Sequence, residues 1–202
     1  ANPPRLVVEY VRRTTVDLLA DAHVYQASPG TNYGASDTLY VRGGTVGHLE
    51  HALLQFSMST IPAGSTIISA SLGLETYLTR DPGAPAAFSI APEAIVGGSW
   101  KEATVTWTNA PGSASRGDPS YVWTTNAWNW LDVTQIVDAW SSGAATNYGI
   151  KVVPATGIGT AGFFSSESGA LSAPTLVVTY GLPPCYAATS ATISGAVAGV
   201  TG

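Results

Sequence analysis

Apolar and polar side chains alternate along most of this chain, which is the period of a β-strand with one buried face. Two examples are HALLQFSMS (51–59) and STIISASLGLETYLT (65–79). Segments of the same kind occupy 15–25, 37–44, 88–95, 103–111, 148–155, 161–168 and 174–181. Turn-forming stretches rich in Gly, Pro and Asn, such as SPGTNYG and RDPGAP, separate them. Short strands at this spacing predict an all-β fold, either a β-sandwich or a jelly roll.

One segment follows the helical period instead. In LDVTQIVDAWSSG (131–143), apolar residues stand at positions i, i+3, i+4 and i+7, namely Val133, Ile136, Val137 and Trp140. Asp132 or Thr134 can cap the start of a helix here, and Gly143 can end it. The pattern predicts one short helix lying across an end of the sandwich.

A strand-like phrase occurs twice, as PRLVVEY (4–10) and as PTLVVTY (174–180). Residues 182–202 carry no charged side chain, and their ATISGAVAGV part alternates like a strand. We therefore divide the chain into an N-terminal strand extension (1–11), a β-sandwich (12–181) and an apolar C-terminal extension.

The composition narrows the classes of function. Only 10% of the residues are charged and 45% are hydrophobic, whereas about a quarter of a typical soluble domain is charged. The net charge of −5 without a basic cluster argues against nucleic-acid binding. No apolar run approaches the ~18 residues of a membrane span. A surface poor in Lys and Glu and rich in Thr, Ser and Gly favours an extracellular or cell-surface location.

The lone cysteine, Cys185, excludes a disulfide within the chain. Cys185 either packs as a small apolar residue, which we favour, or links two chains in an oxidising compartment.

Seven phrases, in a fixed order, cover most of residues 15–180: ADAHVYQASPGTNYGASDTLYV, HALLQFSMSTIPAGSTIISASLGL, SWKEATVTWTNAP, WLDVTQIVDAW, NYGIKV, FFSSES and PTLVVTY. Together they resemble the DNRLRE (disaggregatase-related) domain family and the similar family 96 carbohydrate-binding modules. The pattern W-x-E-x-x-V-T-W-x-N-A-P is the most specific part of the resemblance.

The resemblance implies an extracellular β-sandwich of jelly-roll type that serves as a non-catalytic module of a secreted or surface protein. Some related modules bind acidic or neutral polysaccharides. Where members of the family have Arg in F-x-S-R-E, this chain has Ser166, which weakens the case for an anionic-glycan contact there. In the family P-x-L-V-V-x-Y is the closing strand, so residues 4–10 resemble a second closing strand.

Three explanations of the second closing strand stay open: the end of a preceding tandem repeat, an extra strand on the domain's own sheet, or a donor strand that pairs with a neighbouring subunit. The third leads to our main hypothesis, a structural surface protein that assembles with copies of itself into a fibre or array. An added strand would gain ladder hydrogen bonds and bury apolar side chains at the junction. The residues that would join subunits are Leu6, Val7, Val8 and Tyr10.

The alternative hypothesis is a carbohydrate-binding module. All six tryptophans lie between residues 100 and 140, and sugar rings stack on exposed aromatic faces. Trp100, Trp107 and Trp140 belong to the family pattern and are expected in the core. The candidates for a glycan-stacking surface are Trp123, Trp128 and Tyr121.

Calcium is the one cofactor that the residues suggest, because jelly-roll modules often hold a hard cation with carboxylate and carbonyl oxygens. The candidate ligands near predicted strand ends are Asp17, Asp21, Asn32, Asp37 and Asp132. Asp and Asn also hydrogen-bond their own backbone in turns, and we favour that role for this set.

We expect no catalytic site. Glycoside hydrolysis needs two acids facing each other across a cleft, whereas the glutamates lie in separate segments: Glu75, Glu93, Glu102 and Glu167. The histidines, His23, His48 and His51, show no metalloprotease spacing. We expect His23 on the surface.

Overall fold

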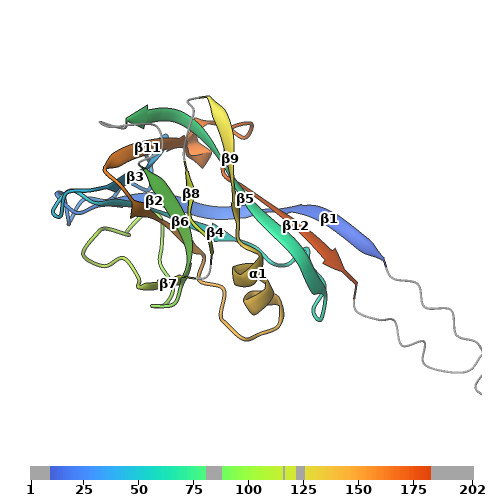
Figure 1. Cartoon of the computed structure of the whole chain (residues 1–202). Coiled ribbons are helices and arrows are strands. Elements are labelled where there is room, and N and C mark those ends of the chain that lie inside the picture. The colour runs from blue at the N-terminus through green and yellow to red at the C-terminus, as the bar shows by residue number, and fades with distance from the viewer. Residues whose placement is uncertain (1–9, 81–87, 116, 122–125, 183–202) are drawn as a thin grey trace, which may run out of the picture.

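The structure, a computed structural model, describes residues 10–80, 88–115, 117–121 and 126–182. These residues are mostly β-structure (Figure 1). The strands in chain order are β1 (Val11–Val16), β2 (Leu18–Tyr25), β3 (Thr38–Gly43), β4 (Glu50–Phe56), β5 (Thr66–Arg80), β6 (Ser89–Ile95), β7 (Ser113–Ser115), β8 (Ser120–Tyr121), β9 (Ala127–Asp132), β10 (Ile150–Thr156), β11 (Gly159–Phe164) and β12 (Thr175–Gly181). The α-helix α1 (Thr134–Ser141) and the 3₁₀ helix η1 (Ser166–Ser168) complete the described elements. The all-β class predicted from the sequence is confirmed.

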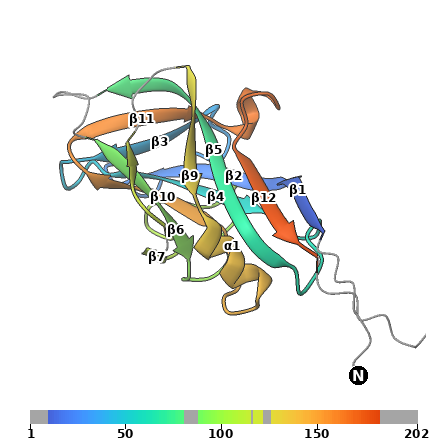
Figure 2. The ribbon, with the colours of Figure 1, turned by 45° about the vertical axis from the view of Figure 1, so that its right-hand side comes forward.

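The strands form two antiparallel layers. In the first, β5 pairs with β12 along its N-terminal half, with β11 along its C-terminal half, and with β9 on its opposite edge. β1 adds to β12, and β3 adds to β11. In the second layer, β4 lies between β2 and β10, β10 pairs with β6, and β6 carries β7 and β8. The two layers are connected where Arg42 of β3 pairs with Glu50 of β4. Figure 2 shows β9, β5 and β12 of the first layer side by side.

The main hydrophobic core lies between the layers. In β12, Leu176, Val178 and Tyr180 are buried, whereas the residues between them face outward. They belong to the same cluster as Leu54 and Phe56 of β4. Each fully buried side chain of this size contributes roughly 1.5–3 kcal/mol. The period-two pattern of the sequence therefore decides which face of each strand is inside and which face is free for contact with a ligand.

The predicted helix is confirmed as α1. The Asp132 carboxylate accepts a hydrogen bond of 2.8 Å from the backbone N–H of Thr134, the first helical residue. Gly143, with φ +76°, follows the helix in the left-handed conformation that suits glycine. The buried residues of the helix are Ile136, Val137, Ala139 and Trp140. None of the described helices is long and apolar enough to cross a membrane.

The strand predicted at 103–111 is wrong, because this segment forms successive turns between β6 and β7. The Asn109 side chain bonds backbone groups within the loop, and the Asn32 amide donates to the Val105 carbonyl at 2.7 Å. Val105 and Trp100 pack in a second, smaller core under this loop. The apolar residues of the segment are therefore buried by a loop that side-chain amides hold in place.

The described part of the N-terminal extension pairs with its own domain. β1 runs antiparallel to β12 of the same chain, from Val11 opposite Gly181 to Val16 opposite Leu176. The Leu182 N–H donates to the Tyr10 carbonyl at 3.1 Å. Residues 10–16 are thus an edge of the domain's own sheet. The predicted subunit-joining residues Leu6, Val7 and Val8 lie outside the described residues, as does Cys185.

Candidate functional site

Two tryptophans stand on the outer face of β9. The sequence AWNWLD alternates, so Trp128 and Trp130 point to solvent while Leu131 enters the core. Trp128 is 37% exposed and Trp130 is 48% exposed. Their ring centroids lie 5.8 Å apart, and the ring planes differ by 25°. Neighbouring aromatic rings left open to solvent are typical of a binding surface rather than of a structural core.

Trp130 lies across β5 because the residue opposite it is a glycine. The register of β5 and β9 places Trp130 opposite Gly73. A Cβ atom added at Gly73 would lie 2.7 Å from Cζ3 and 2.8 Å from Cη2 of Trp130. Glycine inside a strand often marks such a close approach. The indole ring therefore covers the β5 backbone in the space that a side chain would fill.

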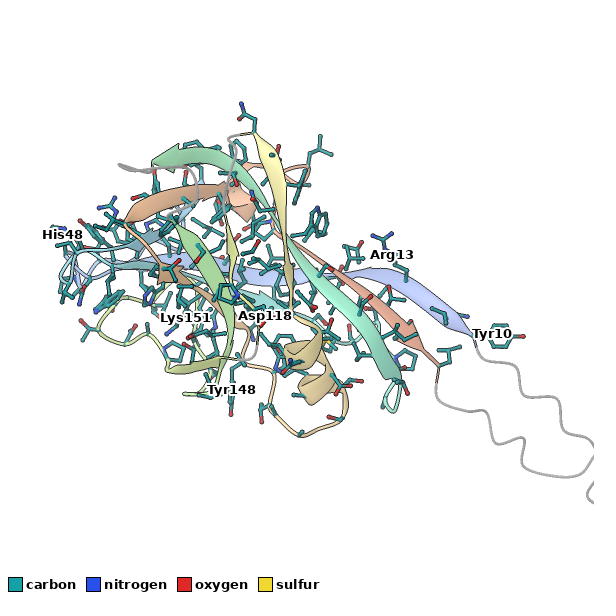
Figure 3. All side chains as sticks on the ribbon, in the orientation of Figure 1. Tyr10, Arg13, His48, Asp118, Tyr148 and Lys151 are labelled. Atoms are coloured by element: carbon teal, nitrogen blue, oxygen red, sulfur yellow. The ribbon has the colours of Figure 1, made fainter. Side chains whose placement is uncertain are left out.

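A shallow pocket of ≈ 260 Å³ adjoins Trp130 on the same face. The lining of the pocket comes from β1, β12 and β5. The strand register places Thr179 of β12 between Arg13 of β1 and Ser69 of β5. Figure 3 shows Arg13 projecting from β1. The lining residues are Arg13, Ser69, Ser71, Trp130, Val177 and Thr179. We call Trp128 together with these pocket residues the tryptophan face.

Two carboxylates border this face. Glu75 is opposite Trp128, and Asp132 is opposite Ser71, in the register of β5 and β9. Directly opposite residues on one face have Cβ atoms about 5 Å apart. The face therefore combines aromatic rings with hydroxyl, guanidinium and carboxylate groups.

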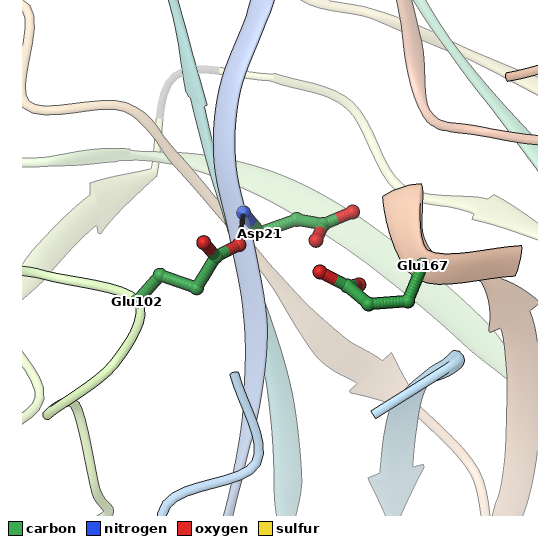
Figure 4. Close-up of side chains that lie close together, drawn as sticks. All are labelled: Asp21, Glu102 and Glu167. Atoms are coloured by element: carbon green, nitrogen blue, oxygen red, sulfur yellow. Dashed lines mark hydrogen bonds between the residues drawn. The ribbon is translucent and has the colours of Figure 1, made fainter. Parts of the chain in front are cut away.

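A separate group of three carboxylates lies at another position in the fold (Figure 4). Asp21 comes from β2, Glu102 from the loop after β6, and Glu167 from η1. One oxygen from each residue lies within 4.8 Å of the others. The Asp21 N–H donates to Glu102 Oε1 at 2.9 Å. Carboxylates so close together can bind a divalent cation.

Asp21 is the buried member of this acidic group. Its carboxylate accepts hydrogen bonds from the backbone N–H and the hydroxyl of Ser166, at 2.8 and 2.9 Å. Burial raises the pKa of Asp21 to about 6, the Ser166 hydrogen bonds oppose that rise, and the charges of Glu167 and Glu102 add to it. Burial of this carboxylate therefore lowers the free energy of unfolding at neutral pH, where the group is ionised.

The family model of carbohydrate-binding module family 96 matches residues 12–180. The chain belongs to this family. No curated protein matches the chain significantly. The family 96 match supports the alternative hypothesis, a carbohydrate-binding module, and spans both the tryptophan face and the acidic group.

Of the stacking residues predicted from the sequence, the structure of this family 96 module places only Trp128 on the tryptophan face. Trp123 lies outside the described residues. Tyr121 belongs to β8, which pairs with β6 rather than with β9, and its side chain is not among those described. Trp130 was not among the candidates predicted from the sequence, although the alternation from Trp128 to Trp130 was the signal that could have identified it. The pocket residues gave no local signal because they meet only through strand pairing.

The predicted calcium ligands do not lie together. Asp21 belongs to the acidic group, and Asn32 lies near it, with its amide donating to the Glu102 carbonyl at 2.7 Å. Asp37 accepts a hydrogen bond from the Thr38 hydroxyl, Asp17 contacts Ser57 through its carbonyl, and Asp132 bonds the start of α1. Calcium remains a prediction, with Glu102 and Glu167 as the partners of Asp21 that the sequence did not reveal.

The surface position predicted for His23 is wrong. His23 is 4% exposed, its ring stacks on Tyr33 at 4.4 Å, and its Nδ1 bonds the Thr38 carbonyl. Burial lowers its pKa to about 4, so the ring is neutral at pH 7. Of the tryptophans expected in the core, Trp100 and Trp140 are buried and Trp107 is half-buried.

Proposed function

We propose that this chain is the carbohydrate-binding module of a secreted or surface protein and that it holds a polysaccharide on the tryptophan face. The observation that carries the proposal is the exposed pair Trp128 and Trp130 beside a pocket lined with hydroxyl groups. The family 96 match supports the class of ligand.

The chemistry of the face suits a sugar. The C–H bonds of a pyranose ring carry partial positive charge and meet the negative face of an indole ring favourably. The hydroxyl groups at the ring edge need hydrogen-bond partners, which Ser69, Ser71 and Thr179 can supply beside Trp130. Binding sites of this kind combine apolar contact area with a few polar groups that fix orientation.

The expected strength follows from the exposed area. A tryptophan side chain presents about 250 Å², of which 48% is open at Trp130. A sugar ring covering half of that open area removes roughly 60 Å² from water, which is worth about 1.5 kcal/mol. Loss of this contact corresponds to a roughly tenfold weaker affinity.

The test is calorimetric titration of a panel of soluble polysaccharides with the wild-type chain and with Trp128→Ala and Trp130→Ala. We expect at least one polymer to bind, and each substitution to weaken binding by roughly tenfold. Leu171→Ala is the control, because Leu171 is 94% exposed and lies outside the tryptophan face. A polymer that binds both tryptophan variants as tightly as the wild type would place the site elsewhere and refute the proposal.

A further inference from the structure

We infer that the tryptophan face takes an uncharged polysaccharide, bound along an internal stretch of its chain; this rests on the proposed function and specifies its ligand. Two features of the face support this: its charged side chains are mostly acidic, and it extends from β9 across β5 and β12 to β1.

The described charges on the face are mostly acidic. Arg13 is its one cation, at the far side of the pocket from β9. Glu75 and Asp132 stand beside the two tryptophans. The whole chain has a net charge of −5. A polymer with a negative charge on every sugar would meet one guanidinium and two carboxylates, so its charges would be repelled where its rings must stack.

The other described cationic side chains do not lie on this face, and the side chain of Arg80, at the end of β5, is not among those described. Lys101 is in the loop after β6, next to Glu102 of the acidic group. Arg42 is paired with Glu50 at 3.5 Å in the bridge between the layers, and Lys151 is buried and donates to the Pro111 carbonyl. Arg12 neighbours Arg13 in β1, so its side chain leaves the opposite side of that strand. No ladder of basic groups that could match a polyanion is present on the described part of the face.

The same polar groups fit neutral hydroxyl groups. A carboxylate accepts from two hydroxyls and a guanidinium donates to two, so Glu75, Asp132 and Arg13 can each bind adjacent hydroxyls of a sugar ring. Serine and threonine hydroxyls both donate and accept, which lets Ser69 and Thr179 match a sugar hydroxyl in either role. An uncharged polymer therefore finds partners on the whole face, whereas the carboxylates of an anionic polymer find one cation, Arg13, and are repelled by Glu75 and Asp132.

The face extends over four neighbouring strands. Its path starts at Trp128, passes Trp130 on β9, and crosses β5 and β12 to Arg13 on β1. Three strand spacings of about 4.8 Å give a length of roughly 14 Å from β9 to β1. This is long enough for more than one sugar ring, which fits a stretch of a polymer rather than a single terminal sugar.

The experiment compares neutral and anionic polymers on the full chain. Hydroxyethylcellulose, galactomannan and soluble starch serve as neutral probes and polygalacturonate as the anionic one, each titrated at low and at high salt. We expect at least one neutral polymer to bind at least tenfold more tightly than polygalacturonate, with an affinity that salt leaves unchanged. Capping the reducing end of that polymer should not alter its affinity.

Charge variants make the inference sharper. In Glu75→Gln with Asp132→Asn, each side chain loses its negative charge and keeps one acceptor oxygen. Polygalacturonate should therefore gain affinity, whereas the neutral polymer should gain none and should lose some because it has fewer acceptors. Arg13→Gln should weaken the neutral polymer several-fold, equally at both salt concentrations, because an uncharged ligand responds to the lost hydrogen-bond donors and little to the lost charge. Thermal unfolding of each variant confirms that it is folded.

Two results would overturn the inference in distinguishable ways. If polygalacturonate binds more tightly than every neutral probe, in a salt-sensitive manner that Arg13→Gln abolishes and Trp130→Ala weakens, the proposed function stands and the ligand is anionic. If no probe shows binding that depends on Trp130, the proposed function itself fails.

Discussion

Replacing Gly73 by Ala tests whether the strand beneath Trp130 positions its ring. The added Cβ would lie 2.7 Å from the nearest ring atom of Trp130, whereas carbon atoms in contact prefer about 3.5–4.0 Å. The ring must therefore move by roughly 1 Å or rotate away from the sheet. Because the obstructing atoms belong to an exposed side chain and not to the backbone, the sheet itself can stay in place.

The magnitudes favour a loss of binding without a loss of fold. Holding Trp130 about 30° from its preferred rotamer costs roughly 0.5–1.5 kcal/mol. Replacing glycine by alanine reduces the entropy of the unfolded chain and recovers about 0.4–1 kcal/mol. The net change in unfolding free energy should stay within about 1 kcal/mol. The affinity for polysaccharide should fall by up to the roughly tenfold contribution of Trp130.

The assay pairs polysaccharide titration with urea unfolding. Gly181→Ala is the matched control, because Gly181 also lies in a strand of this sheet and a Cβ there would meet nothing within 4 Å. We expect Gly181→Ala to bind like the wild type and Gly73→Ala to bind like Trp130→Ala. Binding of Gly73→Ala at wild-type affinity, when Trp130→Ala has lost it, would refute the idea that Gly73 positions the ring.

Asp21→Asn removes a carboxylate whose pKa burial raises to about 6. The folded state holds that proton more tightly than the unfolded chain, so wild-type stability falls as pH rises from about 4 to about 6. The gain in unfolding free energy of Asp21→Asn over wild type should therefore grow across this window to about 3 kcal/mol and then stay constant. Urea unfolding in chelator at a series of pH values measures it, and a difference independent of pH would contradict the burial argument. If calcium binds Asp21, Glu102 and Glu167, adding it after chelation should raise the Tm of the wild type but not of Asp21→Asn; equal shifts would place the ion elsewhere. Deleting residues 1–9 leaves the pairing of β1 with β12 intact, so light scattering should give the mass of one chain for both forms. Assembly of the full chain alone would instead support the fibre hypothesis.

The sequence predicted the elements whose burial follows a local period. The alternation of 65–79 and 174–181 became β5 and β12, and the apolar stripe of 131–143 became α1. The same reasoning failed at 103–111, where Val105 is buried by a loop. The amide contacts from Asn32 and Asn109 that hold that loop leave no periodic trace in the sequence.

Only half of the tryptophan face could be predicted from the sequence, for a related reason. Trp128 and Trp130 lie two residues apart, so alternation alone places them on one side of a strand. Arg13 and Ser69 join them only because β1, β12 and β5 pair in one particular register. From the sequence alone, Gly73 is only a residue that weakens a strand. Its role becomes clear once Trp130 is known to lie opposite it.

The pairing of β1 with β12 has a mechanical consequence. Tyr10 and Leu182 are hydrogen-bonded neighbours at the outer end of these two antiparallel strands. A pulling force applied between them would load the hydrogen bonds one after another, as in a zipper, rather than all at once in shear. Peeling would move Arg13 of β1 away from Thr179 of β12 before it reached the core. Tension on this domain would thus open the pocket beside Trp130 early in the extension, while the sandwich beneath remained folded.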